Sequence, residues 1–306
     1  MAPDVLVTGG AGFIGSRIAA SLLGGGYAVV VADDLSTGRL ENVPSEATFV
    51  QADLAHEDGI AVLPDRPYAA ILHLAGQSSG EKSFEDPARD FDANARSTLL
   101  LARWALDRRI PTLLHASSMG VYGNAGPAPV AEDAPTRPLS YYGASKLAAE
   151  RVLGIAAAQG LRTVSFRMFN VYGRGQDLDN LKQGMVSIYL AYLLRGEPVV
   201  VKGALDRVRD LVHVDDIVEA WRLGLERPVS GPFNLGTGVG TRVGDLLARL
   251  IEAVGAPADV VEAPPTPGDI HSCVADISRA RGELGWEPRI GLDEGLRELV
   301  AVRSPA

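Results

Sequence analysis

Short runs of apolar residues alternate in the first half of the chain with longer stretches that mix apolar and polar positions. The runs are almost continuous in Val, Leu and Ile, which is typical of strands buried on both faces of a sheet. They predict strands at Val5–Thr8, Ala28–Ala32, Thr48–Gln51, Ala70–Leu74, Thr112–Ala116 and Thr163–Arg167. The longer stretches predict helices at Phe13–Leu23, Asp86–Leu106 and Tyr142–Ala158.

This alternation indicates an α/β fold with a doubly wound parallel sheet of the Rossmann type. The second half is less regular, and it predicts helices at Met185–Leu194, Asp215–Leu225, Ser278–Leu284 and Leu292–Arg303 and a strand at Val199–Val201. We therefore expect an NAD-binding Rossmann domain over residues 1–170, to which about 210–235 return. A smaller C-terminal substrate-binding domain is expected over 171–306.

The composition is that of a globular protein with one large domain or two closely joined ones. The chain has 306 residues, of which 46% are hydrophobic and 22% charged. The net charge of -9 comes without a basic block, which argues against a nucleic-acid partner. We recognise no signal peptide and no apolar run long enough to span a membrane, so no membrane partner is expected. The single cysteine excludes an internal disulfide and favours a cytoplasmic location.

Three glycines follow the first predicted strand and open the first predicted helix. Gly9, Gly12 and Gly15 have the spacing of a phosphate-binding turn, where glycines permit a tight turn, close approach to a pyrophosphate and close helix–strand packing. The helix N-terminus at Phe13 and Ile14 adds amide donors and a favourable dipole. The pattern predicts a dinucleotide site, and the alternative is a glycine-rich packing turn.

A carboxylate at the end of the second predicted strand indicates which dinucleotide is bound. Asp33 is placed to accept hydrogen bonds from the adenosine ribose, and a carboxylate there repels a 2′-phosphate. We therefore expect NAD in preference to NADP, with Arg39 as the nearby residue that argues the other way. Asp53, followed by Leu54, is a candidate contact of the adenine, and an ordinary turn residue is the alternative.

Tyr142 and Lys146 are four residues apart and therefore share one face of a helix. A nearby ammonium and a positive nicotinamide ring favour the phenolate, so we expect the pKa of Tyr142 to be lowered and the phenol to act as a general base. Lys146 is also placed to hydrogen-bond the nicotinamide ribose. After the fifth strand, the hydroxyl of Ser118, with Ser117 as its fallback, is expected to share the proton on the substrate oxygen. A surface Tyr–Lys pair and a turn serine are the alternatives.

Taken together, these residues resemble the extended short-chain dehydrogenase/reductases, and among them the nucleotide-sugar 4-epimerases of the UDP-galactose 4-epimerase type. The resemblance runs nearly end to end through Thr8–Gly15, Asp33–Gly38, His73–Gly76, Asn94, Ser117–Gly123, Tyr142–Lys146, Arg167–Gly173, Arg209–Asp216 and Gly268–Asp276. It implies that further contacts to NAD come from Asp34, Ser36, Thr37, Gly38, Leu74, Ala75, Gly76, Asn94 and Ser117.

The resemblance implies an isomerase with tightly bound NAD that inverts C4 of UDP-glucose or UDP-galactose. Tyr142 would remove the proton of the sugar 4-hydroxyl while hydride passes from C4 to NAD. The transient 4-keto sugar would turn about its diphosphate before the hydride returns to the other face. A homodimer, paired through the helices near Asp86–Leu106 and Tyr142–Ala158, is also implied.

The resemblance also assigns contacts to the nucleotide sugar. Asn170 matches an asparagine on the diphosphate, and Arg209 matches an arginine on the phosphates, whose planar fork suits phosphate oxygens. An ion pair of Arg209 with Asp210 or Asp206 is the alternative. The other matched positions are Asn180 and Leu181 beside the nucleotide and Val200 and Lys202 around the uracil, with Gln77, Lys82, Ser118, Tyr142, Asp269 and Cys273 completing the predicted site.

Two positions bear on the substrate. The family usually has a second phosphate-binding arginine where this chain has Thr266, so Arg209 and the helix amides must suffice, or Arg174 or Arg207 replaces it. Cys273 aligns with the residue that limits bulk beside C2 of the sugar. A small residue there resembles enzymes that also accept N-acetyl sugars, which predicts room for UDP-GlcNAc and UDP-GalNAc. The alternative for Cys273 is buried apolar filler.

Other functions of related enzymes place different demands on these residues. A UDP-glucuronate 4-epimerase or decarboxylase needs a cation or hydroxyls for the sugar carboxylate, which Ser78, Ser79 and Lys82 could supply. Sugar 4,6-dehydratases typically carry Asp-Glu after the catalytic hydroxyl, where this chain has Met119 and Gly120, so that activity is rejected. A non-catalytic NAD(P)-sensing protein is the remote alternative, because such proteins tend to lose the Tyr or the Lys.

Overall fold

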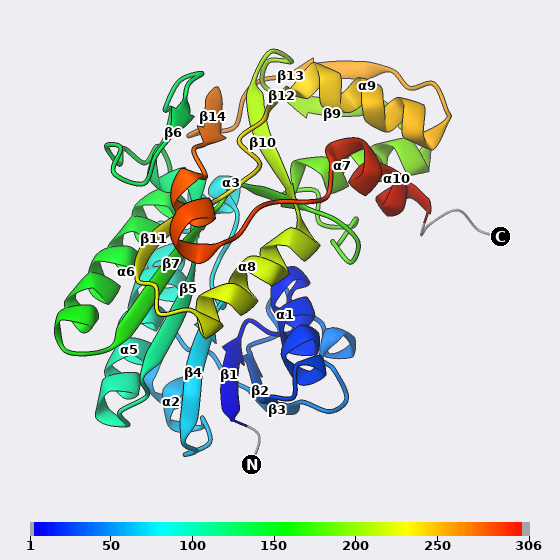
Figure 1. Cartoon of the computed structure of the whole chain (residues 1–306). Helices are drawn as coiled ribbons and strands as arrows, with labels where there is room; N and C mark the ends of the chain where they lie inside the picture. The colour runs from blue at the N-terminus through cyan, green and yellow to red at the C-terminus, as the bar shows by residue number, and fades with distance from the viewer. Residues whose placement is uncertain (1–2, 302–306) are drawn as a thin grey trace.

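A seven-stranded parallel sheet forms the larger lobe of the computed structural model, which describes residues 3–301 (Figure 1). This confirms the predicted doubly wound α/β fold, and the strand order is β11-β7-β5-β4-β1-β2-β3. The strands are β1 (Asp4–Thr8), β2 (Ala28–Asp33), β3 (Thr48–Gln51), β4 (Tyr68–His73), β5 (Thr112–Ser118), β7 (Arg162–Met168) and β11 (Gly231–Leu235). The edge strand β11, which contains Pro232, was not predicted, because its pairing with β7 depends on the return of a distant segment.

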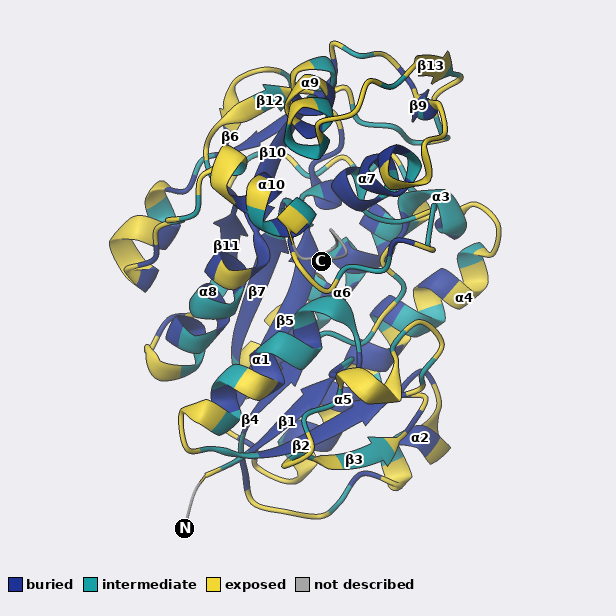
Figure 2. Ribbon diagram, turned by 90° about the vertical axis from the view of Figure 1, so that its right-hand side faces the viewer, coloured by how far each residue is buried: buried dark blue, intermediate teal, exposed yellow. Residues whose placement is uncertain are grey.

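Alternate residues of the central strands pack on opposite faces of the sheet, which is why these strands are apolar throughout (Figure 2). On one face Val5 and Val7 join the cluster that includes residues of α1 and α8. On the other face Leu6 joins residues of α5 and α6. These helices span α1 (Phe13–Gly24), α8 (Val214–Glu226), α5 (Ser97–Asp107) and α6 (Tyr141–Ala158).

The helix predicted at Asp86–Leu106 is divided into α4 (Pro87–Phe91), a π-helical stretch (Asp92–Arg96) and α5. Side-chain hydroxyls compete there for backbone carbonyls: Thr98 Oγ1 donates to Asn94 O at 2.6 Å and Ser97 Oγ to Ala93 O at 2.6 Å. Such π-helical stretches are frequent at functional sites, and this one contains Asn94.

A smaller lobe lies beyond the carboxyl ends of the sheet strands, at the top of Figure 1. Its core is formed by α7 and α9, with α10 packed on α9. The strand β10 pairs with β12, β14 and β8, and β9 pairs with β13. Its elements are β6 (Pro129–Val130), β8 (Asn170–Tyr172), α7 (Met185–Arg195), β9 (Val199–Lys202), β10 (Val208–His213), β12 (Gly240–Arg242), α9 (Val243–Val254), β13 (Val260–Ala263), β14 (Ser272–Ala275) and α10 (Leu292–Ala301).

The predicted helices of the second half are present in the described part of the chain. The segment predicted at Ser278–Leu284 is helical, with a π-helical end at Ala280–Leu284. The end of the last predicted helix, at Arg303, lies outside the described residues. Between residues 3 and 301, no helix is long and apolar enough to cross a membrane.

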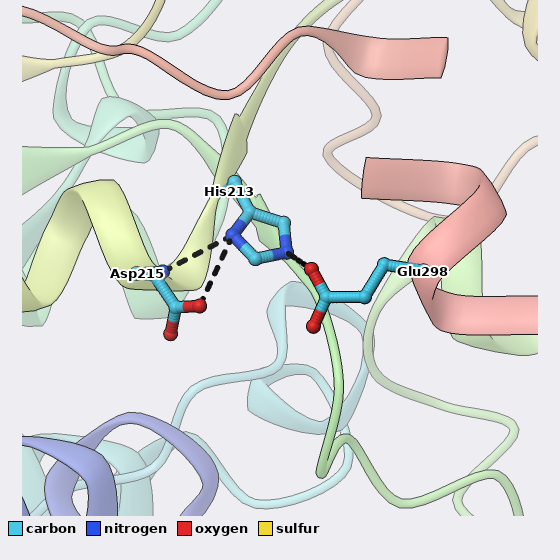
Figure 3. Close-up of side chains that lie close together, drawn as sticks. All are labelled: His213, Asp215 and Glu298. Atoms are coloured by element: carbon cyan, nitrogen blue, oxygen red, sulfur yellow. Dashed lines mark hydrogen bonds and ion pairs between the residues drawn. The ribbon is translucent and has the colours of Figure 1, made fainter. Parts of the chain in front are cut away.

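His213 connects α10 to the start of α8 (Figure 3). The imidazole is fully buried, with Nδ1 3.8 Å from Asp215 Oδ2 and Nε2 3.7 Å from Glu298 Oε2. The Asp215 N–H donates to His213 Nδ1 at 3.3 Å, so the ring also caps α8. The two ring nitrogens thus face carboxylates of different helices, Asp215 of α8 and Glu298 of α10.

Candidate active site

The glycine turn between β1 and α1 is built for close backbone contact. Gly9 has φ +69°, and a Cβ there would lie 2.5 Å from Ala75 N, while a Cβ at Gly15 would lie 2.2 Å from Gly9 O. A Cβ at Gly12 would meet only Gly9 O, at 3.2 Å, so Gly12 is open on its other side. Gly12 caps α1 without a side-chain hydrogen bond, and no acidic residue occupies the first turn. The amides at Phe13 and Ile14 therefore fit an anionic pyrophosphate.

Asp33 lies at the end of β2 beside this turn. Its Oδ2 accepts the Ala11 N–H at 3.0 Å and its Oδ1 accepts the Leu35 N–H at 2.9 Å. Burial raises the pKa of this carboxyl, while the two backbone hydrogen bonds lower it. A Cβ at Gly38 would lie 2.8 Å from Asp33 Oδ1, so only glycine fits there without a shift. The oxygens keep lone pairs for further donors, as ribose hydroxyls would supply.

The other residues predicted on the adenosine side are distributed around this edge. Asp34, Ser36 and Thr37 are exposed, and Asp34 Oδ1 accepts the Ser36 N–H at 2.9 Å. The Asp53 side chain bonds within its own turn, to the Ala55 N–H at 3.0 Å, as the turn alternative describes. Leu54 is 3% exposed and belongs to the core against the sheet. Arg39 lies 3.3 Å from Asp177.

The carboxyl end of β5 and the first turns of α6 bring the predicted catalytic residues together. Lys146 is 3% exposed, and its Nζ lies 5.9 Å from the centroid of the Tyr142 ring. The Ser118 side chain lies beside the Tyr142 phenol and lowers its pKa, and Ser118 Oγ accepts the Gly120 N–H at 3.1 Å. Ser117 points to the opposite face of the strand, where its Oγ donates to Glu150 Oε1 at 2.5 Å. Ser118 is therefore the hydroxyl that adjoins Tyr142.

The prediction that the pKa of Tyr142 is lowered is wrong when only the residues of the chain act on it. Burial raises this pKa to about 12, against a lowering by the Ser118 hydrogen bond, and Asp90 raises it further. Burial lowers the pKa of Lys146 to about 8, while Asp90 raises it. With these contributions alone, the Tyr142 phenol keeps its proton at neutral pH.

A buried polar network beside Lys146 joins the predicted residues Gln77 and Asn94 to Asp90 and Ser145, which were not predicted. Asp90 is 1% exposed, and its two oxygens accept from Ser145 Oγ at 2.5 Å and Gln77 Nε2 at 2.7 Å. Asn94 Nδ2 donates to Ser145 Oγ at 3.0 Å. Asp90 precedes Asn94 by four residues, a spacing that places both on one face of a helix, and this pattern is the sequence signal for Asp90.

Gly76 joins this network to the glycine turn. It has φ +151°, and a Cβ there would lie 2.4 Å from Asn94 Oδ1 and 3.2 Å from Lys146 Nζ. Leu74 and Ala75 precede it, and the Ala75 N–H donates to Thr8 Oγ1 at 3.3 Å. The segment expected to contact the cofactor therefore lies directly against the candidate catalytic lysine.

Several predicted substrate residues lie where the second lobe meets the sheet. Asn170 Nδ2 donates to Asp210 O at 3.0 Å. Asn180 Oδ1 accepts the Lys182 N–H at 3.2 Å. The intervening residue, Leu181, is partly buried. Lys202 lies 2.7 Å from Glu81, and Val200 is partly buried on the same strand.

The residues considered for a sugar carboxylate lie in and just before α3 (Gly80–Ser83). Ser78 Oγ accepts from Gln183 Nε2 at 2.6 Å, and Ser79 Oγ donates to Lys182 O at 2.8 Å. Lys82 is partly buried. Ser79 thus uses its hydroxyl proton on the loop of the second lobe, whereas Ser78 accepts and keeps its own donor.

Arg209 is ion-paired, but with neither of the partners that the sequence suggested. Its Nη2 lies 3.0 Å from Asp269 Oδ1, whereas Asp210 accepts backbone N–H groups from Thr237, Gly238 and Ala275. Of the two arginines considered as replacements for one at Thr266, Arg207 contacts the same Asp269, at 2.8 Å.

Two more positions complete this region. Arg174 is exposed, and its carbonyl accepts from Arg17 of α1 at 2.7 Å, on the side of the glycine turn. Cys273 is opposite Arg209 in the β10–β14 pairing and is 0% exposed, and burial raises the pKa of its thiol to about 12. It therefore lies immediately beside the arginine expected on the phosphates.

Known proteins share this arrangement of elements. Residues 5–236 match the NAD dependent epimerase/dehydratase family. The chain is 39% identical over 303 residues to a UDP-glucose 4-epimerase of Mycolicibacterium smegmatis, with 96% of each chain covered. It superposes on the UDP-glucose 4-epimerase of Thermotoga maritima with UDP-glucose at a TM-score of 0.94, with 37% identity and 97% of each chain covered. For the Thermus thermophilus UDP-glucose 4-epimerase complex with NAD, the TM-score is 0.92 and the identity 38%, with 97% of this chain and 98% of that chain covered.

A solved enzyme that acts on an N-acetyl sugar nucleotide is also similar. It is the UDP-N-acetylglucosamine 4-epimerase from Methanobrevibacter ruminantium in complex with UDP-N-acetylmuramic acid. The TM-score is 0.90, with 30% identity and 98% of each chain covered.

Proposed function

Because the chain belongs to the NAD-dependent epimerase/dehydratase family, we propose that it is a nucleotide-sugar 4-epimerase that inverts C4 of a UDP-hexose. The observation that carries this proposal is the meeting of Tyr142, Ser118 and Lys146 beside the glycine turn. The named similarities to UDP-glucose 4-epimerases support UDP-glucose and UDP-galactose as the substrate pair.

The residues of the glycine turn fit NAD, which would be held by the α1 amides and Asp33. Bound there, NAD supplies the hydride acceptor that allows C4 to be oxidised and reduced again. With its phenolate form stabilised by the Lys146 ammonium and by the positive nicotinamide ring, Tyr142 would remove the proton of the 4-hydroxyl, and Ser118 would share it. Tyr142 then returns the proton after the 4-keto sugar has turned. Arg209 holds the phosphates during the turn, so that the hexose can rotate without leaving.

Proton NMR of the anomeric region tests the proposal directly. Purified protein is incubated separately with UDP-glucose, UDP-GlcNAc and UDP-glucuronate, first without and then with added NAD. We expect a new doublet of the C4 epimer with UDP-glucose, and its appearance without added NAD would show that the cofactor is tightly bound. If no tube changes even with NAD, the chain is not a 4-epimerase of these sugars. Conversion of UDP-glucuronate alone would point instead to the uronic acid.

Cys273 leads us to propose that N-acetyl sugars are accepted. Cys273→Tyr adds bulk next to Arg209, where C2 of the sugar is expected, and we expect it to lower turnover of UDP-GlcNAc about tenfold or more, in line with the 1–3 kcal/mol typical of steric discrimination. Turnover of UDP-galactose should change little. The same NMR assay compares both sugars, and an equal loss for both would show that Cys273 is only core filler.

We also propose a homodimer formed through α5 and α6. These adjacent helices expose Leu99 (42%) and Ile155 (65%), apolar side chains that pairing would cover. Ile155→Glu is therefore expected to shift the chain to a monomer in size-exclusion chromatography with light scattering. Val62→Glu, at a position that is 56% exposed on another helix end, is the matched control. A wild-type chain that is monomeric at micromolar concentration would contradict the proposal.

A further inference from the structure

Two guanidiniums share one carboxylate in the second lobe. Arg207 and Arg209 are two residues apart around the start of β10, a spacing that places side chains of an extended chain on one face. Arg207 Nη1 lies 2.8 Å from Asp269 Oδ2, and Arg209 Nη2 lies 3.0 Å from Asp269 Oδ1. Both arginine side chains are 5% exposed, and that of Asp269 is 17% exposed.

The two arginines of this cluster carry more positive charge than its single carboxylate neutralises. Arginine stays protonated in proteins, so two guanidiniums and one carboxylate leave a net positive charge away from water. The neighbouring Asp210 pairs with neither arginine, and its oxygens accept three backbone N–H groups instead. A buried charge without a partner is costly, which favours an anionic ligand at this place.

Arg207 also has a hydrogen-bond donor that the chain does not use. Its Nε donates to Ala204 O at 2.9 Å and its Nη1 to Asp269, whereas Nη2 is buried without a hydrogen bond to any residue of the described range 3–301. Burial raises the pKa of the Tyr189 phenol, which lies against the Arg207 guanidinium and near that of Arg209; both charges and the contact with Arg207 lower this pKa. Gly203 has φ +91°, and a Cβ there would lie 2.9 Å from Arg207 Nη1, so a larger residue would displace this guanidinium.

We propose that Arg207 binds the diphosphate of the nucleotide sugar together with Arg209, as the second phosphate-binding guanidinium of this chain. This inference rests on the proposed function. Thr266 stands in the same turn as Asp269, whose N–H donates to Thr266 O at 3.1 Å. An arginine immediately before β10 thus supplies the positive charge that Thr266 does not. Two planar forks suit a diphosphate better than one, because each can bind two phosphate oxygens.

Calorimetric titration with UDP and with uridine tests the role of Arg207. The proteins are the full chain with its NAD, the variants Arg207→Gln and Arg207→Lys, and Arg249→Gln as a matched control that removes an exposed arginine paired with Asp293 at 2.7 Å. We expect Arg207→Gln to weaken UDP about tenfold or more, the size of one charge-assisted hydrogen bond, and to leave uridine unchanged. Arg207→Lys should lose less UDP affinity, and Arg249→Gln none.

The outcomes separate this inference from the proposed function. If the wild-type chain binds no UDP, the nucleotide-sugar function fails and the inference fails with it. If wild type binds UDP and the folded Arg207 variants bind it equally well, only the inference is overturned. An equal loss of UDP and uridine would show that Arg207 merely supports the lobe. Thermal unfolding of each variant verifies folding, and Arg207→Lys keeps the test decisive if Arg207→Gln does not fold.

Discussion

Replacing Tyr142 by phenylalanine is expected to lower kcat for C4 inversion about 10³-fold, within the range that a positioned acid–base group contributes. The change removes only the hydroxyl, so the contact of the aromatic ring with Lys146 and the fold should be kept. Because the Tyr142 hydroxyl lies beside Ser118, its loss also leaves that serine without its polar neighbour. The rate of epimer formation, measured by NMR with UDP-glucose and excess NAD, gives the effect.

The control for Tyr142→Phe is the adjacent residue. Tyr141 is 44% exposed, and the centroid of its ring lies 5.3 Å from that of Phe84. Tyr141→Phe should therefore keep nearly full activity. Binding of UDP-glucose to Tyr142→Phe should remain close to wild type. If Tyr142→Phe retains more than about a tenth of the wild-type rate, another group moves the proton, since general acid–base catalysis contributes about 10²-fold at least.

Asp90→Asn is expected to move the pH–rate profile to lower pH by about one unit, the smaller end of the shifts that a neighbouring charge causes. Asp90 raises the pKa of Lys146, which burial has lowered to about 8, and it also raises the pKa of Tyr142. Without the carboxylate both pKa values fall, so Lys146 loses its proton at a pH where the wild-type ammonium persists. At pH 8 we expect kcat to fall about 10²-fold, part of it from the broken network.

A pH series distinguishes this role of Asp90 from simple structural support. The deficit of Asp90→Asn should shrink as pH falls from 8 to 6, because Lys146 regains its proton. Asp92→Asn, two residues along and paired at 3.8 Å with Arg96 on the surface, is the matched control and should leave the profile in place. A uniform loss at every pH would mean that Asp90 supports the fold without setting the charge of Lys146.

Much of the fold could be predicted from the sequence because the signals are local. Continuous apolar runs identify strands buried on both faces, as Val5–Thr8 shows, and six of the seven sheet strands were predicted in this way. The glycines of the first turn and the helical spacing of Tyr142 and Lys146 are also local. These patterns determined the fold class and the candidate acid–base pair without any long-range contact.

The tertiary structure decided what depends on burial and on distant partners. Burial, with a smaller contribution from Asp90, reversed the expected pKa shift of Tyr142, and the neighbour of Ser117 was Glu150, 33 residues away. The partner of Arg209 was Asp269, 60 residues away, instead of an adjacent aspartate. Asp90 became a candidate only when the fold placed it beside Lys146. Charge and proton affinity are set by the surroundings in three dimensions, whereas sequence spacing reports only the neighbours along the chain.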